Sequence, residues 1–409
     1  MVDKTRTFPP VDEQMALLRR GIVDLVTEDE LLKKLERGTP LTVKVGFDPT
    51  APDIHLGHTV LLRKMRHFQD LGHRVIFLIG DFTGLIGDPS GRSETRPALT
   101  PEQILQNAET YKKQCFKILH PERTEILFNS EWLGALGSEG FIRLAARYNV
   151  ARMLERKDFK KRYQAGESIA MHEFLYPLAQ AYDSVALKAD VELGGTDQLF
   201  NLNVGRDIMP GYDLAPQVVM TVPLLEGLDG VQKMSKTLDN YVGVDEAPRS
   251  IFGKIMSISD DLMWRYYELC TDVSVEGIAQ MKGLVEQGEL HPKMAKEGLA
   301  MRILADFHDE KTAREAREEF QRIFVEKKAP DEVAEHRIPA GDGKIFLPKL
   351  LVSLGLASSN TEAMRLIRQG GVKLDDETVA SDTRDIRAKA GETKLVKVGK
   401  RRFSRVIFT

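Results

Sequence analysis

The 409-residue sequence predicts an α/β protein: a doubly wound parallel sheet, then an all-helical segment, then a small α+β tail. Three observations support this order. Strand-like and helix-like segments alternate through the first half, a pattern typical of parallel sheets covered by helices. Strand signals vanish between about residues 248 and 333. After Gly343 two short helical segments precede alternating, strand-like segments.

The first half contains five segments with strand character, at residues 41–48, 74–82, 124–133, 189–198 and 216–225. Helices are expected at residues 59–73, where Leu61, Leu62, Met65 and Phe68 share one face, at 101–119, opened by Thr100 and Pro101, and from 199 onward. Sheets of this kind bind ligands at the carboxyl ends of their strands.

The tail predicts helices at residues 344–357 and 359–371, the second closed at Gly370, and a short strand with a turn at 372–379. Residues 393–408 alternate enough to form a hairpin that turns near Gly399. The preceding "RIPAGDGK", residues 337–344, is typical of a linker.

Charge is distributed unevenly along the chain. Residues 343–409 contain fourteen Lys and Arg and seven Asp and Glu, which gives a net charge of +7. Because the whole chain has a net charge of −3, the other residues have a net charge of −10. Such a basic tail suits a polyanionic partner, although an ordinary solvated surface explains the charge equally well.

Composition indicates a soluble protein, with 42% hydrophobic and 29% charged residues. The longest apolar runs are far shorter than a membrane span. The amino terminus lacks the apolar core of a signal peptide, so we expect a cytoplasmic protein with no membrane association. Cys115 and Cys270 are expected to be reduced thiols, because their spacing fits no metal site.

The stretch "PDIHLGHTV" places His55 and His58 around Gly57 where a strand passes into a helix. No Cys, carboxylate or third His lies at ligand spacing, so no metal site is predicted. Capping or surface histidines remain one interpretation. The other is a phosphate site, because helix amino termini attract anions and imidazoles add directed donors.

Two further loops are rich in cations. "VQKMSKTLDN" contains Lys233 and Lys236, and "GDPSGRSETRP" contains Arg92 and Arg96. Both sets of side chains suit phosphate oxygens. A solvated turn is the alternative for the lysine loop.

Taken together, these motifs resemble a known family. "GFDPTAPDIHLGH" with "KMSKT" resembles the two nucleotide-binding signatures of class I aminoacyl-tRNA synthetases. "FLYPLAQAYDSVAL" and "ELGGTDQLFN" are similar to the amino-acid pocket of the tyrosyl-tRNA synthetases, and the tail resembles a small RNA-binding domain shared with a ribosomal protein and pseudouridine synthases. The resemblance runs from about Val11 to the end, in the order of the bacterial enzymes.

The resemblance implies a Rossmann-like catalytic domain at residues 1–246 that binds ATP and tyrosine, a helical domain on the anticodon side at 247–336, a linker at 337–344 and an RNA-binding domain at 345–409. The implied activity attaches L-tyrosine to tRNA(Tyr). The tyrosine carboxylate attacks the α-phosphorus of ATP, pyrophosphate leaves, and the tyrosyl group then passes to the 3′-terminal adenosine. Mg²⁺ would be carried on the phosphates, and the family is usually a homodimer.

The resemblance also assigns roles to individual positions. Catalytic contacts to the phosphates and the departing pyrophosphate would come from Thr50, His55, His58, Arg92, Arg96, Lys233, Lys236 and Thr237. ATP would also be bound by Gly46, Asp48, Gly57, Asp197, Met234 and Ser235. L-tyrosine would be bound by Lys44, Asp88, Tyr176, Gln180, Asp183 and Gln198, and tRNA by Arg365, Arg368 and Lys373.

The implied chemistry needs no protein nucleophile, because the substrate carboxylate is already ionised. Catalysis must then come from positioning and from stabilisation of charge in the transition state. Asp183 is the expected acceptor of the phenol hydroxyl, the group that separates tyrosine from phenylalanine; this enzyme family is itself the standard example of such discrimination.

Lys44 departs from the better-known bacterial subfamily, which has a tyrosine at this position, two residues before Gly46, that touches the substrate hydroxyl. The sequence also reads "KMSK" in place of that subfamily's phenylalanine–glycine variant. Both features resemble the second bacterial subfamily. We expect Lys44 to lie near Asp183 and to help hold it ionised.

Three alternatives stay open at this stage. A tryptophanyl-tRNA synthetase shares the fold and both nucleotide motifs but usually lacks such a tail. A small-molecule nucleotidyltransferase would need neither the tail nor the helical segment. A non-catalytic RNA-binding paralogue is expected to have lost some of His55, His58, Lys233 and Lys236.

Overall fold

The computed structural model describes residues 8–50, 53–88, 100–324, 334–341, 343–375, 377–399 and 402–409. The chain divides into two compact units, Met1–Glu310 and Lys311–Thr409. The division into domains at residues 246, 336 and 344 stays a prediction.

The first unit is built on a six-stranded sheet in the order β1-β6-β5-β2-β3-β4. Its strands are β1 (Asp24–Val26), β2 (Thr42–Phe47), β3 (Arg74–Ile79), β4 (Thr124–Phe128), β5 (Val191–Gly195) and β6 (Val218–Val222). Five of them are parallel, and only β1, at one edge, is antiparallel. The predicted doubly wound α/β fold is therefore confirmed.

The order of strands reverses between β2 and β5. The chain runs from β2 outward to β3 and β4 on one side, and β5 with β6 lies on the other. Ligands of open α/β sheets bind at such a switch point, beyond the carboxyl ends of the strands. Here those ends are Phe47 and Gly195.

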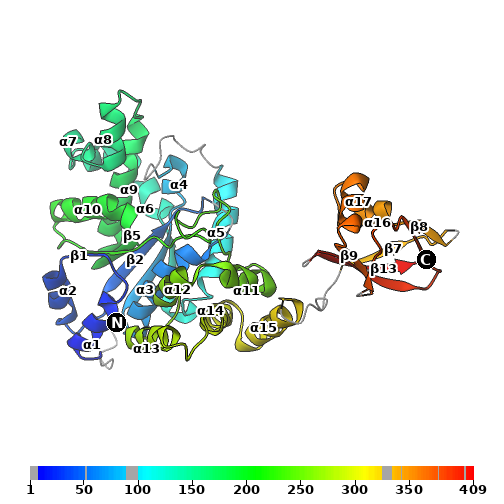
Figure 1. Ribbon diagram of the computed structural model, residues 1–409. Helices are drawn as coiled ribbons and strands as arrows, with labels where there is room; N and C mark the ends of the chain where they lie inside the picture. The colour runs from blue at the N-terminus through cyan, green and yellow to red at the C-terminus, as the bar shows by residue number, and fades with distance from the viewer. Residues whose placement is uncertain are drawn as a thin grey trace. The chain divides into compact units, whose positions relative to one another are not determined.

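Helices cover both faces of the sheet. Helices α9 (Met171–Leu187) and α10 (Leu199–Ile208) lie on one face, and α3 (Leu56–Asp70) with α12 (Asp260–Cys270) beside it lies on the other (Figure 1). The remaining helices of this unit are α1 (Val11–Arg19), α2 (Glu28–Leu35), α4 (Thr83–Ile86), α5 (Pro101–Cys115), α6 (Ser130–Ala145), α7 (Val150–Met153), α8 (Lys157–Gln164), α11 (Pro248–Ser257), α13 (Val275–Glu286), α14 (Pro292–Phe307) and the 3₁₀ turns η1 (Pro121–Arg123), η2 (Thr196–Gln198) and η3 (Met209–Tyr212).

The predicted strand at 124–133 is too long. Strand β4 ends at Phe128, and α6 begins at Ser130. The amide of Ser130 donates to Asp81 Oδ1 at 2.9 Å, and Asn129 Oδ1 accepts from the Phe82 amide at 3.0 Å. Side-chain acceptors thus replace the ladder partners of these amides, so the chain leaves the sheet here.

The second unit contains α15 (Glu310–Phe324), α16 (Leu347–Ser353), α17 (Asn360–Arg368) and, in its described residues, two small sheets. One sheet has the order β10-β9-β12-β13-β7 and the other pairs β11 with β8. The strands are β7 (Glu335–Ile338), β8 (Lys344–Phe346), β9 (Val372–Leu374), β10 (Glu377–Thr378), β11 (Asp385–Arg387), β12 (Thr393–Val398) and β13 (Arg402–Phe408).

The predicted α+β character of the tail is confirmed, with two differences. Residues 344–346, expected at the start of a helix, form β8 and pair with β11. Part of the predicted linker is also strand, since Arg337 and Ile338 belong to β7. The hairpin of β12 and β13 forms as expected, and Gly399 adopts a φ of 64° after β12, a conformation that favours glycine.

Candidate functional site

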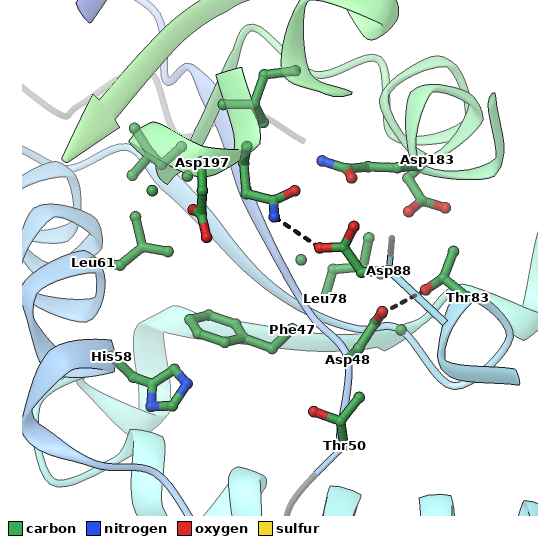
Figure 2. A pocket seen from close by; sticks show the side chains of 18 of the residues that line it. Phe47, Asp48, Thr50, His58, Leu61, Leu78, Thr83, Asp88, Asp183 and Asp197 are labelled. Carbon is green, nitrogen blue, oxygen red and sulfur yellow. Dashed lines mark hydrogen bonds between the residues drawn. The ribbon is translucent and has the colours of Figure 1, made fainter. Parts of the chain in front are cut away.

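Two adjoining cavities open at the switch point of the sheet. The first, of about 300 Å³, reaches from Thr50 and His58 to Asp183 (Figure 2). The second, of about 330 Å³, lies against the start of α3 and the lysine loop. Seven residues line both cavities: Phe47, His58, Leu61, Gly195, Asp197, Gln198 and Lys233.

Asp48 and Tyr176 form the polar floor of the first cavity. Asp48 accepts hydrogen bonds from Thr83 Oγ1 at 2.7 Å and from the Tyr176 hydroxyl at 2.8 Å. Burial raises the pKa of Asp48 to about 7. The absence of a side chain at Gly80 is required here, because a Cβ would collide with the side chains of Asp48 and Thr83. The structure thus places Asp48, expected at ATP, together with the predicted tyrosine-binding residues.

Asp183 lies at the far end of the same cavity and is only 3% exposed. Its two carboxylate oxygens accept from Trp132 Nε1 at 2.8 Å and Asn129 Nδ2 at 3.3 Å. Burial is the main reason that the pKa of Asp183 rises to about 7; the Lys44 charge and both hydrogen bonds oppose this rise. A buried carboxylate with two donors already in place is an acceptor ready for a hydroxyl group of a ligand.

Asp88 adds another carboxylate to the cavity wall. Gln198 Nε2 donates to Asp88 Oδ2 at 2.8 Å (Figure 2), and Gln198 Oε1 accepts from Asn201 Nδ2 at 3.0 Å. Asp48, Asp88 and Asp183 therefore give the first cavity an acidic lining, which suits ammonium and hydroxyl groups better than anions.

Lys44 does not line either cavity. Its side chain is fully buried, and Nζ lies 2.8 Å from Glu192 Oε1 on the neighbouring strand. The expectation that Lys44 touches the ligand is therefore wrong in its geometry: the ammonium group pairs with Glu192. Its charge nevertheless lowers the pKa of Asp183, as the sequence interpretation anticipated.

The two histidines sit at the start of α3. His55 is the N-cap, and its Nδ1 accepts from the Gly57 amide at 3.2 Å; His58 Nδ1 accepts from the His55 amide at 3.2 Å. Each neutral ring must therefore carry its proton on Nε2. Burial lowers the pKa of His55 to about 2 and that of His58 to about 4, so both rings are neutral donors at pH 7.

Gly57 lies between the two histidines in the sequence, after Leu56. A Cβ at this position would lie 3.0 Å from the His55 ring and 3.5 Å from the Met234 Cβ. The backbone of α3 is thus exposed to the second cavity without a side chain in the way. Helix amino termini favour anions, because the helix dipole is positive at this end.

The lysine loop closes the second cavity on its other side. Lys233 Nζ lies 3.5 Å from Asp197 Oδ2, and Lys236 Nζ lies 3.3 Å from Asp53 Oδ2. Met234 and Ser235 line the cavity, and their amides donate to Leu225 O and Asn240 Oδ1, each at 2.8 Å.

The other predicted residues of the site are placed less centrally. Gly46 and Thr50 line the first cavity. Thr237 lies in an exposed turn and lines neither cavity. Arg92 and Arg96 lie outside the described residues.

The predicted RNA-binding residues lie in the second unit. Arg365 and Arg368 occupy the last turn of α17, and Lys373 is in β9. Lys373 is directly opposite Lys397 of β12. Like charges opposite one another on neighbouring strands are unfavourable unless an anion offsets them.

Neither a metal cluster nor a membrane span is found in the described part of the chain. None of its residues form a group of three or more His, Cys, Asp or Glu suited to a metal ion. Its helices are also too short or too polar to cross a bilayer.

Sequence reasoning missed four residues of the first cavity and its support: Gly80, Asn129, Trp132 and Glu192. Asn129 and Trp132 were concealed within the over-long strand prediction at 124–133. The signal that marks them is the polar "NSEW" directly after an apolar strand, where ligand-facing residues of parallel sheets gather.

Comparison with known proteins gives two family matches. The family described as tRNA synthetases class I (W and Y) matches residues 36–325, and the S4 domain family matches residues 347–382. Among curated relatives, the tyrosine–tRNA ligase of Oleidesulfovibrio alaskensis is 59% identical over 397 residues, 97% of this chain and 99% of the relative. That of Geobacter sulfurreducens is 55% identical over 402 residues, with 97% and 99% covered.

Solved structures show the same fold. The tyrosyl-tRNA synthetase of Archaeoglobus fulgidus, complexed with L-tyrosine, has a TM-score of 0.61 at 24% identity and covers 76% of this chain and 100% of its own. The truncated mitochondrial tyrosyl-tRNA synthetase of Aspergillus nidulans has a TM-score of 0.64 at 22% identity, with 78% and 95% covered. On the family match over residues 36–325 and the identity to its curated relatives, this chain belongs to the class I tRNA synthetases of the tryptophan and tyrosine group.

Proposed function

We infer that this chain is a tyrosine–tRNA ligase, which forms tyrosyl-adenylate from L-tyrosine and ATP and then transfers the tyrosyl group to the 3′-terminal adenosine of tRNA(Tyr). The identity of 55–59% to tyrosine–tRNA ligases over nearly the whole chain supports this function. The single structural observation that carries it is Asp183, a buried acceptor at the closed end of an acidic cavity.

The geometry supports one orientation for the amino acid. The phenol hydroxyl would donate to Asp183, whose oxygens are already fixed by Trp132 and Asn129. The α-ammonium group would lie among Asp88, Tyr176 and Gln180. Phenylalanine would leave the buried Asp183 without this hydroxyl donor, at the cost of an unpaired polar group.

The carboxylate of the substrate would then point toward the wall shared with the second cavity. There the triphosphate would meet the Nε2–H groups of His55 and His58, with Gly57 allowing the adenine to approach the backbone. Asp197 would bind the ribose. Lys233 and Lys236 would stabilise the charge that builds up on the departing pyrophosphate. Arg92, Arg96, Thr50 and Thr237 stay candidates for the same role.

These groups supply charge stabilisation and orientation, and the substrate carboxylate is the nucleophile. Preorganised neutral imidazoles are suited to this because they donate hydrogen bonds without changing protonation state near pH 7. Mg²⁺ would enter with ATP on the phosphate oxygens, as is usual for this ion.

The second unit would bind tRNA(Tyr), and the S4 domain match at residues 347–382 supports this. Arg365, Arg368 and Lys373 would contact phosphates of the RNA.

We also propose a homodimer that works in the cytoplasm. Large apolar side chains are strongly exposed within residues 142–171, where Ile142, Val150 and Met171 are 70%, 59% and 76% exposed. Contact with a second chain would remove this apolar surface from water. Sedimentation at micromolar concentration should give the mass of two chains, and a monomer would contradict the proposal.

The test of the function is ATP–pyrophosphate exchange with each of the twenty amino acids. We expect exchange with tyrosine alone. Exchange with tryptophan instead would favour the sibling enzyme of the same family, and RNA binding without exchange would indicate a non-catalytic paralogue.

A further inference from the structure

A buried ion pair lies beneath the first cavity. Lys44 on β2 and Glu192 on β5 are register partners, and their side chains are 0% and 1% exposed. Neither lines the cavity. Pairs this deep rarely gain net stability over apolar side chains of the same volume, so we expect this pair to have a role beyond stability.

Glu192 is the centre of a set of hydrogen bonds directed at α9. Its carboxylate accepts from Gln180 Nε2 at 3.1 Å and Ser184 Oγ at 3.2 Å, and also from Gln217 Nε2. Lys44 Nζ reaches the Gln180 backbone oxygen at 3.3 Å. The pair therefore holds Gln180 at both its backbone and its side chain.

A carboxylate can only accept hydrogen bonds, whereas an amide has one accepting and one donating end. Glu192 thus selects which end of the Gln180 amide faces it, namely the nitrogen. Since Gln180 also lines the first cavity, the end left for a ligand is the accepting oxygen. An oxygen there attracts an ammonium group; a flipped amide would present N–H donors and repel it.

We propose that Glu192, held in place by Lys44, is a positioning residue that fixes the Gln180 amide so that its oxygen accepts a hydrogen bond from the α-ammonium group of the amino-acid substrate. This inference rests on the proposed function and adds two residues to it. Glu192 acts through Gln180 and never touches the substrate.

The test compares two ligands that differ only in the ammonium group: L-tyrosine and 3-(4-hydroxyphenyl)propanoate. Their dissociation constants are measured by calorimetry for the full chain and for Glu192→Gln. A glutamine at 192 has nearly the same shape but can face Gln180 with either end of its amide. We expect tyrosine to bind about 10-fold more weakly, the loss of a charge-assisted hydrogen bond, and the propanoate to bind within about twofold of wild type.

Two further variants separate positioning from damage to the fold. Ser184→Ala removes another donor to the same carboxylate without altering the Gln180 amide, and should keep the wild-type ratio of the two constants. Gln180→Leu should reduce the preference for tyrosine over the propanoate, measured as the ratio of the two dissociation constants, by the same factor as Glu192→Gln. The double variant Gln180→Leu/Glu192→Gln should reduce this preference no further than either single variant. If Glu192→Gln does not fold, Lys44→Met/Glu192→Gln, which removes both charges, takes its place with the same expected ratio.

Equal weakening of both ligands, or unchanged tyrosine binding by folded Glu192→Gln, would overturn the proposal while leaving the function intact. Wild-type protein without tyrosine-dependent exchange would overturn the function and this inference together.

Discussion

Trp132 donates a hydrogen bond to Asp183, the carboxylate that we propose binds the phenol hydroxyl of the substrate. Its Nε1 donates to Asp183 Oδ1 at 2.8 Å, and the pKa of Asp183 is raised to about 7, so about half of the molecules carry the charge at pH 7. Trp132→Phe keeps an aromatic ring and removes the donor. A hydrogen bond to a charged group contributes about 1.5 kcal/mol, so the pKa of Asp183 should rise by about one unit.

The consequence is a shift in the pH profile. The charged fraction at pH 7 falls from about a half to about a tenth, so kcat/KM for tyrosine should fall about fivefold there. The acidic limb of the profile should move up by about one unit, and the two profiles should meet above pH 9. ATP–pyrophosphate exchange between pH 6 and 9 measures this directly.

The other tryptophan of the chain is a matched control. Trp264 lies on α12, stacked on Tyr267, and lines neither cavity. Trp264→Phe should leave the profile in place. If Trp132→Phe lowers activity by the same factor at every pH, or if Trp264→Phe moves the acidic limb equally, the charge of Asp183 does not set the pH profile.

Three other predictions concern separate parts of the molecule. Lys236→Ala should lower kcat of tyrosine activation by about 100- to 1000-fold, as for loss of one transition-state donor, with the tyrosine dissociation constant unchanged; stopped-flow activation and equilibrium binding would separate the two, and weakened tyrosine binding would contradict it. The melting temperature of Asp183→Asn, relative to that of wild type at the same pH, should increase as the pH rises from 5 to 8. The pKa of Asp183 is raised from 3.8 to about 7, so this group contributes stability below pH 4 that is lost as pH rises through 7; a constant difference across pH would be evidence against it. Arg368→Ala should reduce the slope of log affinity for tRNA against log salt by about 0.7–0.9 while leaving pyrophosphate exchange unchanged; an unaltered slope would remove Arg368 from the interface.

Much of the site could be predicted because its motifs are local. His55, Gly57 and His58 lie within one stretch of four residues at the start of α3, and Lys233 and Lys236 lie within one loop. The alternation of strands and helices likewise predicted five of the six strands of the first sheet. Each of these signals depends only on neighbours in the chain.

What escaped prediction depends on contacts between distant segments. Glu192 matters only because β5 lies beside β2, which brings it to Lys44 148 residues earlier. Strand β1 was missed because only three residues pair, antiparallel, with β6. Asp183, the hydrogen-bond partner of Trp132, is 51 positions away in the sequence, and no local sequence pattern predicts this contact.

The wall common to the two cavities limits how this protein can change its choice of amino acid. Phe47, Gly195 and Gln198 line both cavities, so an altered side chain at any of them reshapes the second cavity as well as the first. Asn129 and Asp183, at the opposite end, line the first cavity alone. Substitutions that let the protein bind an amino acid with a different ring are therefore confined to that end. In variants selected for a new amino acid, we therefore expect the first tolerated substitutions near Asn129 and Asp183. The residues that line both cavities should stay unchanged.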